Sequence, residues 1–463
     1  MTVSGLPAGF RIEFDPTVRR VRPDLLVGGV PTRMLRLSGR GAEALAELDA
    51  GPVRSAAAGV LARRLTDAGL AHPRPPVVVD DLDLVVIVPA RDRSGSLDRC
   101  LSALGKRYPV TVVDDGSVDP AAIARVASRH GAALVCRSTN AGPAAARNTG
   151  LAATASELVA FVDSDTLPEA DTLTALGAHL ADPAVVAAAP RIVGAAGRTS
   201  VGRYARGRSA LDCGPRPGRV APLGRVPFVP TTALVVRRTA LGSGFDEHLR
   251  FGEDVDLVWR IDAAGGCVRY DPGLRVAHTE PETWWALLVR RHRYGTSAAP
   301  LALRHPGALV PLLVEPWTAS AIGAVLLRRP LVALILLAGG LVEEILMRRQ
   351  TGLPVGESAT AVLNRAQQSC RSVGGYAIKF LGPVVVPMLV RRRSAAVAAL
   401  LLAEPVADWW SGRAIATDPV THVVGHLVED VAYGSGVVVG CARARTAAPL
   451  LPRLRRVRAR LRS

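Results

Sequence analysis

Two apolar runs in the middle of the chain, residues 110–113 and 158–162, each end directly on an acidic motif. Short apolar runs bounded in this way are typical of buried strands in a parallel α/β sheet. The motifs Asp114-Asp115 and Asp163-Ser164-Asp165 would then lie at the carboxyl edge of the sheet, where open α/β sheets bind their ligands. Two carboxylates on one side of a tight turn suit a divalent cation that carries a substrate's diphosphate.

An earlier apolar run, residues 84–88, predicts a further strand with its loop at the same edge. Pro89 is expected to stop this strand, and the loop that carries Arg91 would face the ligand. Asp115 could accept hydrogen bonds from a nucleobase or a ribose, because Gly116 permits the sharp turn behind it. Taken alone, the tripeptide Asp115-Gly116-Ser117 after the apolar run 110–113 is a common turn sequence.

A Gly-Pro turn within residues 140–150 predicts the start of a helix that carries Arg147 and Asn148. A helix amino terminus together with an arginine can hold a phosphate or a base edge. In isolation the segment is equally an ordinary capped helix. Its position between the two acidic motifs favours the binding role.

The order and spacing of these motifs, completed by Glu253-Asp254-Val255-Asp256, resemble those of family 2 glycosyltransferases of GT-A fold over roughly residues 83–300. The resemblance implies an α/β fold built on a Rossmann-like mixed sheet. It implies that the nucleotide sugar is contacted by Pro89, Arg91, Asp115, Arg147, Asn148 and Ser164. It implies a Mg²⁺ or Mn²⁺ site made by Asp163, Asp165 and His278. It also implies that Glu253 and Asp254 are the catalytic pair, with Asp254 as the base.

Sugar transfer with inversion explains why these groups are needed. A base must lie within hydrogen-bond reach of the acceptor hydroxyl, on the sugar face opposite the departing diphosphate. A carboxylate suffices, because the transition state resembles an oxocarbenium ion. The charge that develops on the diphosphate can be neutralised by the divalent cation.

Aromatic and basic residues after the third motif are predicted to bind the acceptor. Tryptophan faces stack on sugar rings and a basic cluster can hold a diphosphate, which assigns this role to Trp284, Trp285 and Arg291. The chain lacks the Gln-x-x-Arg-Trp form found in processive relatives. Alternatively, the two tryptophans anchor an amphipathic helix on a membrane.

Changes in composition and in the hydrophobic pattern predict three domains, residues 1–80, 81–305 and 306–463. The first reads as a strand followed by two short helices in winged-helix style. It resembles the peptide-binding module of enzymes that modify ribosomally made peptides, similar to the small chaperone of pyrroloquinoline quinone assembly. An unrelated capping domain is the alternative.

With this module included, the whole chain resembles the glycosyltransferases of the mycofactocin pathway. That resemblance implies UDP-glucose as the donor and a peptide-derived redox cofactor as the acceptor. The implied product is a β-linked oligoglucoside.

The last part of the chain is apolar and helical in pattern, with arginine clusters between apolar stretches at 308–327, 331–347 and 395–402. Internal prolines and glutamates disfavour simple spanning helices, so interfacial or re-entrant helices are predicted. Residues 450–461 place leucine and valine on one helical face and arginine on the others. This pattern predicts a basic amphipathic helix that lies on anionic lipid.

The formal net charge of +17 resembles that of a nucleic-acid-binding protein, but every basic residue except Lys106 and Lys379 is arginine. Part of this bias reflects a GC-rich genome, and the rest favours an anionic membrane surface or a phosphorylated substrate over nucleic acid. The six cysteines lie far apart without a C-x-x-C pair, which predicts a reducing compartment and no structural zinc. No secretory signal pattern is visible at the amino terminus, so the active domain is expected in the cytoplasm, at the inner face of the membrane.

Two other functional classes stay open at this point. A polyprenyl-phosphate or cell-envelope polysaccharide glycosyltransferase would share the same catalytic core, and the apolar carboxyl-terminal part favours it. A binding protein with a degenerate core would not need intact carboxylates, and Asp115, Asp163, Asp165 and Asp254 are all present.

Overall fold

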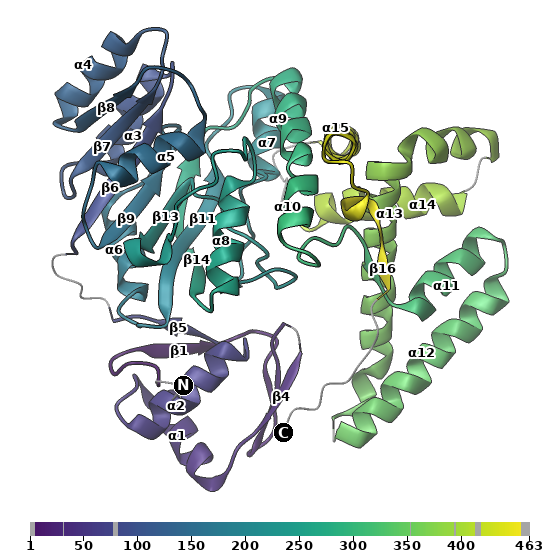
Figure 1. Cartoon of the computed structure of the whole chain (residues 1–463). Helices are drawn as coiled ribbons and strands as arrows, with labels where there is room; N and C mark the ends of the chain where they lie inside the picture. The colour runs from purple at the N-terminus through teal and green to yellow at the C-terminus, as the bar shows by residue number, and fades with distance from the viewer. Residues whose placement is uncertain are drawn as a thin grey trace. The chain divides into compact units, whose positions relative to one another are not determined.

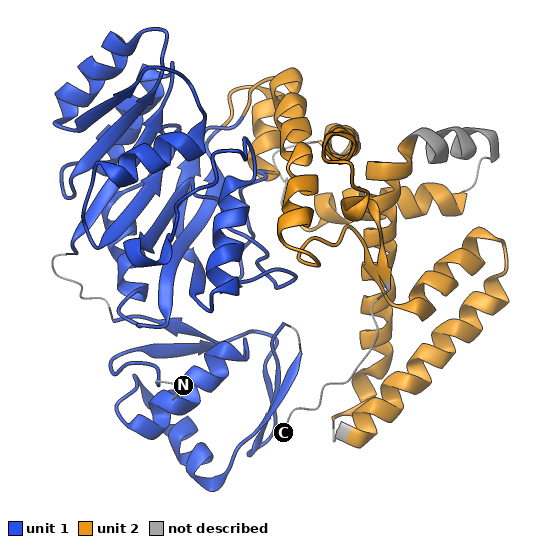
Figure 2. Ribbon diagram, viewed as in Figure 1, with its two compact units in different colours: residues 1–196, 209–280 blue, residues 197–208, 281–463 orange. Residues whose placement is uncertain are grey.

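A computed structural model of the chain describes residues 5–30, 32–76, 82–351, 353–392, 395–412 and 418–454. Contacts divide the chain into two compact units (Figure 2). Unit 1 comprises residues 1–196 and 209–280, and unit 2 comprises residues 197–208 and 281–463. The predicted three-part division at residues 80 and 305 has other boundaries and stays a prediction.

Unit 1 is built on a mixed sheet whose strands follow the order β10-β14-β11-β13-β9-β6-β7-β8, with β12 paired to β14 (Figure 1). The strands are β6 Leu84–Ala90, β7 Val110–Asp115, β8 Ala133–Arg137, β9 Leu158–Val162, β10 Thr166–Leu167, β11 Val185–Gly194, β12 Gly218–Val220, β13 Ala233–Arg237 and β14 Cys267–His278. β9, β6, β7 and β8 run parallel, whereas β13 is antiparallel to both β9 and β11. This arrangement confirms the predicted α/β mixed sheet.

Both faces of the sheet are buried, as alternation along β6 shows. Leu84, Val86 and Val88 belong to one core cluster, and Val85 and Ile87 belong to the other. A strand buried on both faces needs apolar residues at every position, because its side chains alternate between them. The covering helices are α3 Ser94–Leu104, α4 Pro120–His130, α5 Pro143–Ala152, α6 Ala170–His179 and α8 Glu253–Ala263. β6 continues to Ala90, so Pro89 does not stop the strand as predicted.

The amino-terminal module of unit 1 has the two predicted helices but more strands than the sequence suggested. Its elements are β1 Arg11–Phe14, β2 Arg19–Arg22, β3 Leu25–Gly28, β4 Arg33–Arg36, α1 Gly39–Ala50, α2 Ala56–Asp67 and β5 Ala71–Arg74. β2, β3 and β4 form one small sheet, and β1 pairs with β5. Ser38 and Ser55 cap the two helices by accepting hydrogen bonds from Gly41 N and Ala58 N.

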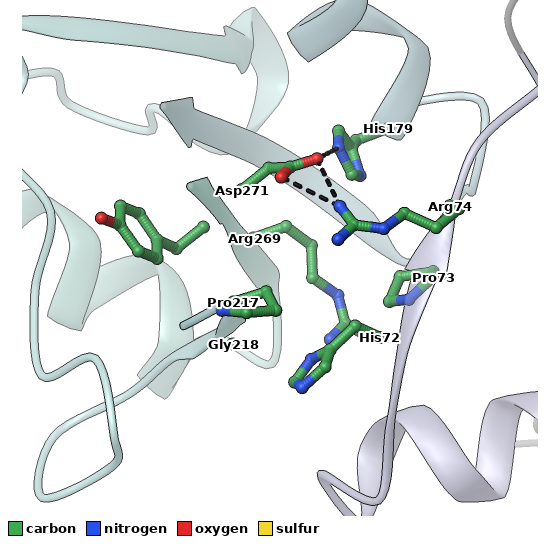
Figure 3. A pocket seen from close by; sticks show the side chains of 9 residues that line it. His72, Pro73, Arg74, His179, Pro217, Gly218, Arg269 and Asp271 are labelled. Atoms are coloured by element: carbon green, nitrogen blue, oxygen red, sulfur yellow. Dashed lines mark hydrogen bonds and ion pairs between the residues drawn. The ribbon is translucent and has the colours of Figure 1, made fainter. Parts of the chain in front are cut away.

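Ion pairs attach this module to the sheet within unit 1. Arg74 of β5 donates from one nitrogen to both carboxylate oxygens of Asp271 on β14, at 3.0 Å each, and His179 contacts the same carboxylate (Figure 3). Arg63 of α2 donates to Asp182 over 2.5 Å, and both side chains are buried. The cavity at this junction measures about 10 Å³, which is room for about one water molecule. It is therefore too small for a nucleotide sugar.

Unit 2 is almost entirely helical. Its elements are α7 Ser200–Gly207, α9 Trp284–Thr296, α10 Ala298–Arg304, β15 Leu313–Val314, α11 Pro316–Leu326, α12 Pro330–Thr351, α13 Ser358–Arg392, α14 Ala395–Trp410, α15 Pro419–Ala444 and β16 Arg453–Leu454. Among the described residues, one segment, residues 330–350 of α12, is long and apolar enough to cross a membrane. Only 17% of its most apolar stretch is buried, so most of that surface lacks protein partners.

Within the apolar stretch 308–327, α11 begins only at Pro316 and has 11 residues, so no single helix spans the stretch, in line with its internal prolines. One sequence-based expectation for unit 2 is wrong. The basic amphipathic helix does not form at residues 450–454: Leu450 ends a short 3₁₀ turn and β16 pairs with β15. The rest of that predicted helix, residues 455–463, lies outside the described part of the chain.

Candidate active site

The first two acidic motifs lie at the carboxyl ends of two parallel strands. β7 ends on Asp115, and Asp163 follows the last residue of β9. β6 lies between these two strands and pairs in parallel with both. The carboxyl ends of the three strands therefore meet at one edge, as the sequence predicted.

Arg147 joins the second acidic motif to the third. Its NH2 donates to Asp163 Oδ1 over 2.7 Å, and its NH1 donates to Glu253 Oε1 over 2.8 Å. The guanidinium is buried and packs over the ring of Phe245. Burial acts to lower the pKa of Arg147, but the carboxylates of Asp163 and Glu253 outweigh it and raise that pKa. Arg147 is thus a permanent cation among the acidic groups.

The two carboxylates of the second motif have different surroundings. Asp163 Oδ2 accepts a hydrogen bond from Thr232 Oγ1 over 3.0 Å. Asp165 Oδ2 accepts from Arg93 NH1 over 3.0 Å, while its Oδ1 lies 3.6 Å from His278 Nε2. Burial raises the pKa of Asp165, partly offset by the charges of His278 and Arg93.

His278, at the end of β14, is held in place from its other side. Its Nδ1 lies 3.2 Å from Glu280 Oε1, and the same oxygen accepts from Ser209 Oγ over 2.6 Å. A carboxylate behind an imidazole fixes the orientation of the ring and makes its other nitrogen a better ligand. The geometry is therefore that of a histidine whose Nε2 is directed towards Asp165.

Asp254 lies in the first turn of α8, beside Glu253. Its Oδ1 accepts a hydrogen bond from Val255 N over 2.8 Å, and its side chain keeps partial access to solvent. Burial, reinforced by the negative charge of Glu253, raises the pKa of Asp254 well above the ordinary aspartate value. A carboxylate with a raised pKa is a stronger proton acceptor than a free aspartate.

Two residues predicted to contact the nucleotide have all or most of their polar groups engaged within the protein. Asp115 accepts from Arg137 Nε, Ala141 N and Gly142 N at 2.8–3.1 Å, which fixes the loop before α5. Asn148 bonds the backbone of Phe245 through both its amide groups. These contacts hold the backbone around the carboxyl edge of the sheet in place.

The remaining predicted nucleotide-sugar residues lie at or near the same edge. Pro89 is half-buried in the penultimate position of β6. Arg91 is exposed in the loop that follows, 3.4 Å from Asp92. Ser164 is half-buried between the two aspartates of the second motif.

The three predicted acceptor residues belong to α9 in unit 2. Trp284 packs against Tyr204, with 5.1 Å between ring centroids. Trp285 is 79% exposed. Arg291 donates to Glu429 over 2.6 Å and to the carbonyl of Arg208. Within unit 2, therefore, Trp285 is the one of the three whose side chain is mostly exposed.

Sequence reasoning missed Arg93, Thr232 and Phe245, which all contact the acidic cluster or its arginine. Arg93 stands two residues after Arg91, so its loop was recognised but not its side chain. Thr232 lies beside Asp163 because β13 pairs antiparallel with β9, bringing Ala233 opposite Val162. Nothing in a single sequence indicates that pairing.

Comparison with known proteins first places the chain in a class. A sequence model described as "Glycosyl transferase family 2" matches residues 85–245. The "Pre-mycofactocin glycosyltransferase" of Mycobacterium tuberculosis (strain CDC 1551 / Oshkosh) is 37% identical over 482 residues, covering 98% of this chain and 100% of the relative. The chain therefore belongs to the mycofactocin glycosyltransferases of glycosyltransferase family 2.

More distant similarity extends over part of the chain. An "N-acetylglucosaminyltransferase" of Rhizobium meliloti (strain 1021) is 28% identical over 265 residues, covering 52% of this chain and 62% of the relative. Among solved structures, a mannosyltransferase from Pyrobaculum calidifontis in complex with GDP-Man and Mn²⁺ has a TM-score of 0.43 and 19% identity, covering 77% of this chain and 89% of that one.

Proposed function

We propose that the protein transfers glucose from UDP-glucose to a peptide-derived precursor of mycofactocin, with inversion, and extends a β-linked oligoglucoside. The observation that carries the catalytic part is the gathering of Asp163, Asp165, Glu253 and Asp254 around Arg147 and the end of β9. The acceptor rests on the name of the 37% identical relative, which is a pre-mycofactocin glycosyltransferase.

Asp254 is the proposed general base. As the acceptor oxygen attacks the anomeric carbon, its proton passes to the Asp254 carboxylate and the bond from that carbon to the UDP oxygen breaks. Glu253 pairs with Arg147, and its negative charge raises the pKa of Asp254. Arg147 in turn holds Asp163 and Glu253 in fixed positions.

Asp165 and His278 suit a divalent cation. Their facing atoms are 3.6 Å apart, a separation compatible with two ligands that bond one ion at about 2.1 Å. Asp163 would complete the site through the lone pairs that Arg147 and Thr232 leave open. A bound Mg²⁺ or Mn²⁺ would neutralise charge on the departing diphosphate.

The remaining roles complete the proposal. Pro89, Arg91 and Ser164 contact the nucleotide sugar at the carboxyl edge of the sheet. Asp115 and Asn148 hold the neighbouring backbone in place. Trp284, Trp285 and Arg291 are proposed to act on the acceptor, and the amino-terminal module is proposed to hold its peptide-derived part. We place the enzyme in the cytoplasm, bound to the inner face of the membrane through unit 2, whose α12 exposes apolar side chains.

Mass spectrometry tests this directly. Purified protein is incubated with Mn²⁺, a panel of UDP-sugars, and either a peptide-derived mycofactocin precursor or a polyprenyl phosphate. Hexose on the precursor, from UDP-glucose alone, is the expected result. The membrane-facing surface of α12 favours the lipid as the second candidate, and hexose on the lipid only would make this an envelope glycosyltransferase.

Single substitutions test the proposed roles of Asp254 and Asp165. Asp254→Asn should lower turnover by about 10²–10⁴-fold, because the amide cannot accept the proton. Asp165→Ala should abolish the response of turnover to added Mn²⁺. Asp171→Asn, at an exposed carboxylate on α6, is the matched control and should leave both unchanged. Full turnover by Asp254→Asn would rule out the proposed base.

A further inference from the structure

A second cluster of metal-ligating side chains lies inside unit 2, where α14 meets α15. Asp408 stands near the end of α14, and His422 and His426 stand one turn apart on α15. His422 is fully buried and the His426 side chain is 4% exposed. None of these residues belongs to the acidic cluster described above.

The two imidazoles lack the partners that buried polar groups normally have. Neither ring nitrogen of His422 has a hydrogen-bond partner, and neither does Nδ1 of His426. His422 Nε2 and His426 Nδ1 lie 3.7 Å and 3.9 Å from the same oxygen, Asp408 Oδ2. These distances are too long for hydrogen bonds, so both rings are directed at the carboxylate without bonding it.

We propose that Asp408, His422 and His426 bind one divalent transition-metal ion, with Zn²⁺ the first candidate. Zinc bonds to imidazole nitrogen and carboxylate oxygen at about 2.0–2.2 Å, so two of its ligands lie roughly 3.3–4 Å apart. The two nitrogen-to-oxygen separations fall in that range, and all three ligand atoms lie within 4.8 Å of one another. Small ring rotations would close the site.

A second carboxylate stands behind one of the two histidines. Asp430 Oδ2 lies 3.8 Å from His426 Nε2, on the far side of the ring, where an orienting carboxylate stands in many metal sites.

Arg208 is the group that competes with a metal ion. It donates to Asp408 Oδ2 and also, over 3.3 Å, to Glu429 Oε2. If a metal takes Asp408, Arg208 keeps Glu429 as its partner. The alternative is that Arg208 alone neutralises Asp408 and no metal binds. The experiment must distinguish these two states.

The test is metal analysis of the full chain, purified without a histidine tag. Mass-spectrometric element analysis should find about one equivalent of zinc that survives dialysis in metal-free buffer. His422→Asn and His426→Gln should lose it. Asp165→Ala should keep it, which separates this ion from any cation at the acidic cluster. His248→Asn, at an exposed histidine of unit 1, is the matched control and should also keep it.

Two further measurements keep the test decisive if replacing a buried histidine prevents folding. Asp408→Asn keeps the shape of the side chain and should weaken zinc binding at least tenfold. Stripped wild-type protein should regain zinc on titration, with a rise in melting temperature, and bound Co²⁺ should give the strong visible absorption of a tetrahedral site. Wild-type protein that neither carries nor takes up either ion overturns the proposal, as does a folded His422→Asn variant with unchanged zinc.

Discussion

Arg147 is the residue on which the arrangement of the acidic cluster depends most. It is the cation that contacts both Asp163 and Glu253, and it is buried. Removing one partner of a buried ion pair leaves an uncompensated charge, whereas an exposed pair contributes little. The cluster therefore needs the guanidinium for its stability as well as its geometry.

Arg147→Met should lower the free energy of unfolding by about 3–5 kcal/mol and abolish sugar transfer. Urea denaturation and donor turnover measure the two effects. Arg107→Met is the control, because the Arg107–Asp171 pair is exposed and its loss should cost about 1 kcal/mol or less. Equal destabilisation by the two variants would contradict the buried role of Arg147.

The pH dependence of turnover should report on Asp254. Only the ionised carboxylate accepts a proton, so turnover should fall as pH drops through a pKa that burial and Glu253 have raised. Glu253→Gln removes the neighbouring negative charge, which lowers the pKa of Asp254. The acidic limb of the pH–rate profile should then move to lower pH, and a limb that stays or moves upward would argue against Asp254 as the titrating group.

At the scale of elements, α12 presents an exposed apolar surface. Leu331, Leu334 and Ile335 are 75%, 62% and 69% exposed, on a helix with little protein cover. An exposed apolar surface of this extent is typical of an interaction site, which supports the membrane contact proposed above.

Replacing Leu331, Leu334 and Ile335 together by serine should weaken association with vesicles of anionic lipid at least tenfold, since each side chain contributes about 1.5–3 kcal/mol when fully buried. Co-sedimentation measures the effect. Val118→Ser, at an 89% exposed valine of unit 1, should change nothing. Undiminished sedimentation of the triple variant would remove α12 from the membrane contact.

The sequence predicted strands β6, β7 and β9 and helix α5 of unit 1, because their signals are local. The Gly142-Pro143 turn starts α5, and the apolar run of β9 ends on Asp163. Contacts that depend on strand pairing or on long side chains were not predicted. Thr232 reaches Asp163 only because β13 pairs antiparallel with β9, and Arg93 reaches Asp165 from another loop. The helix predicted from residue 450 onwards was wrong for a similar reason, because the pairing of β16 with β15 overrides the helical periodicity at Leu454.

The expectation that the chain has no structural zinc was based on the cysteines alone. His422 and His426 stand four residues apart, which places two imidazoles on one face of a helix. That spacing is visible in the sequence. The third ligand, Asp408, comes from another helix, and only the packing of α14 on α15 brings it near.

At the scale of the whole molecule, the attachment of the amino-terminal module decides whether unit 1 behaves as one body. Arg63 and Asp182 are 3% and 0% exposed and join α2 to the loop after α6. Arg63→Met should destabilise unit 1 by about 3–5 kcal/mol, because Asp182 loses its counter-charge.

The double variant Arg63→Met, Asp182→Leu should recover most of that loss, since two apolar side chains can replace a buried ion pair. Urea denaturation of the wild type, both single variants and the double variant gives the coupling energy. Additive single effects would mean that the pair does not hold the module to the sheet.

The hydrogen bond between Arg147 and Glu253 spans 106 residues of chain. Contacts of such long range form late, because a large loop must close before they contribute. A nascent or partly folded chain can hold its parallel strands in register and still lack a working arrangement of carboxylates. Catalytic activity should therefore reappear as one of the last events of refolding, later than helical and strand signals, which makes it a sensitive reporter of complete folding.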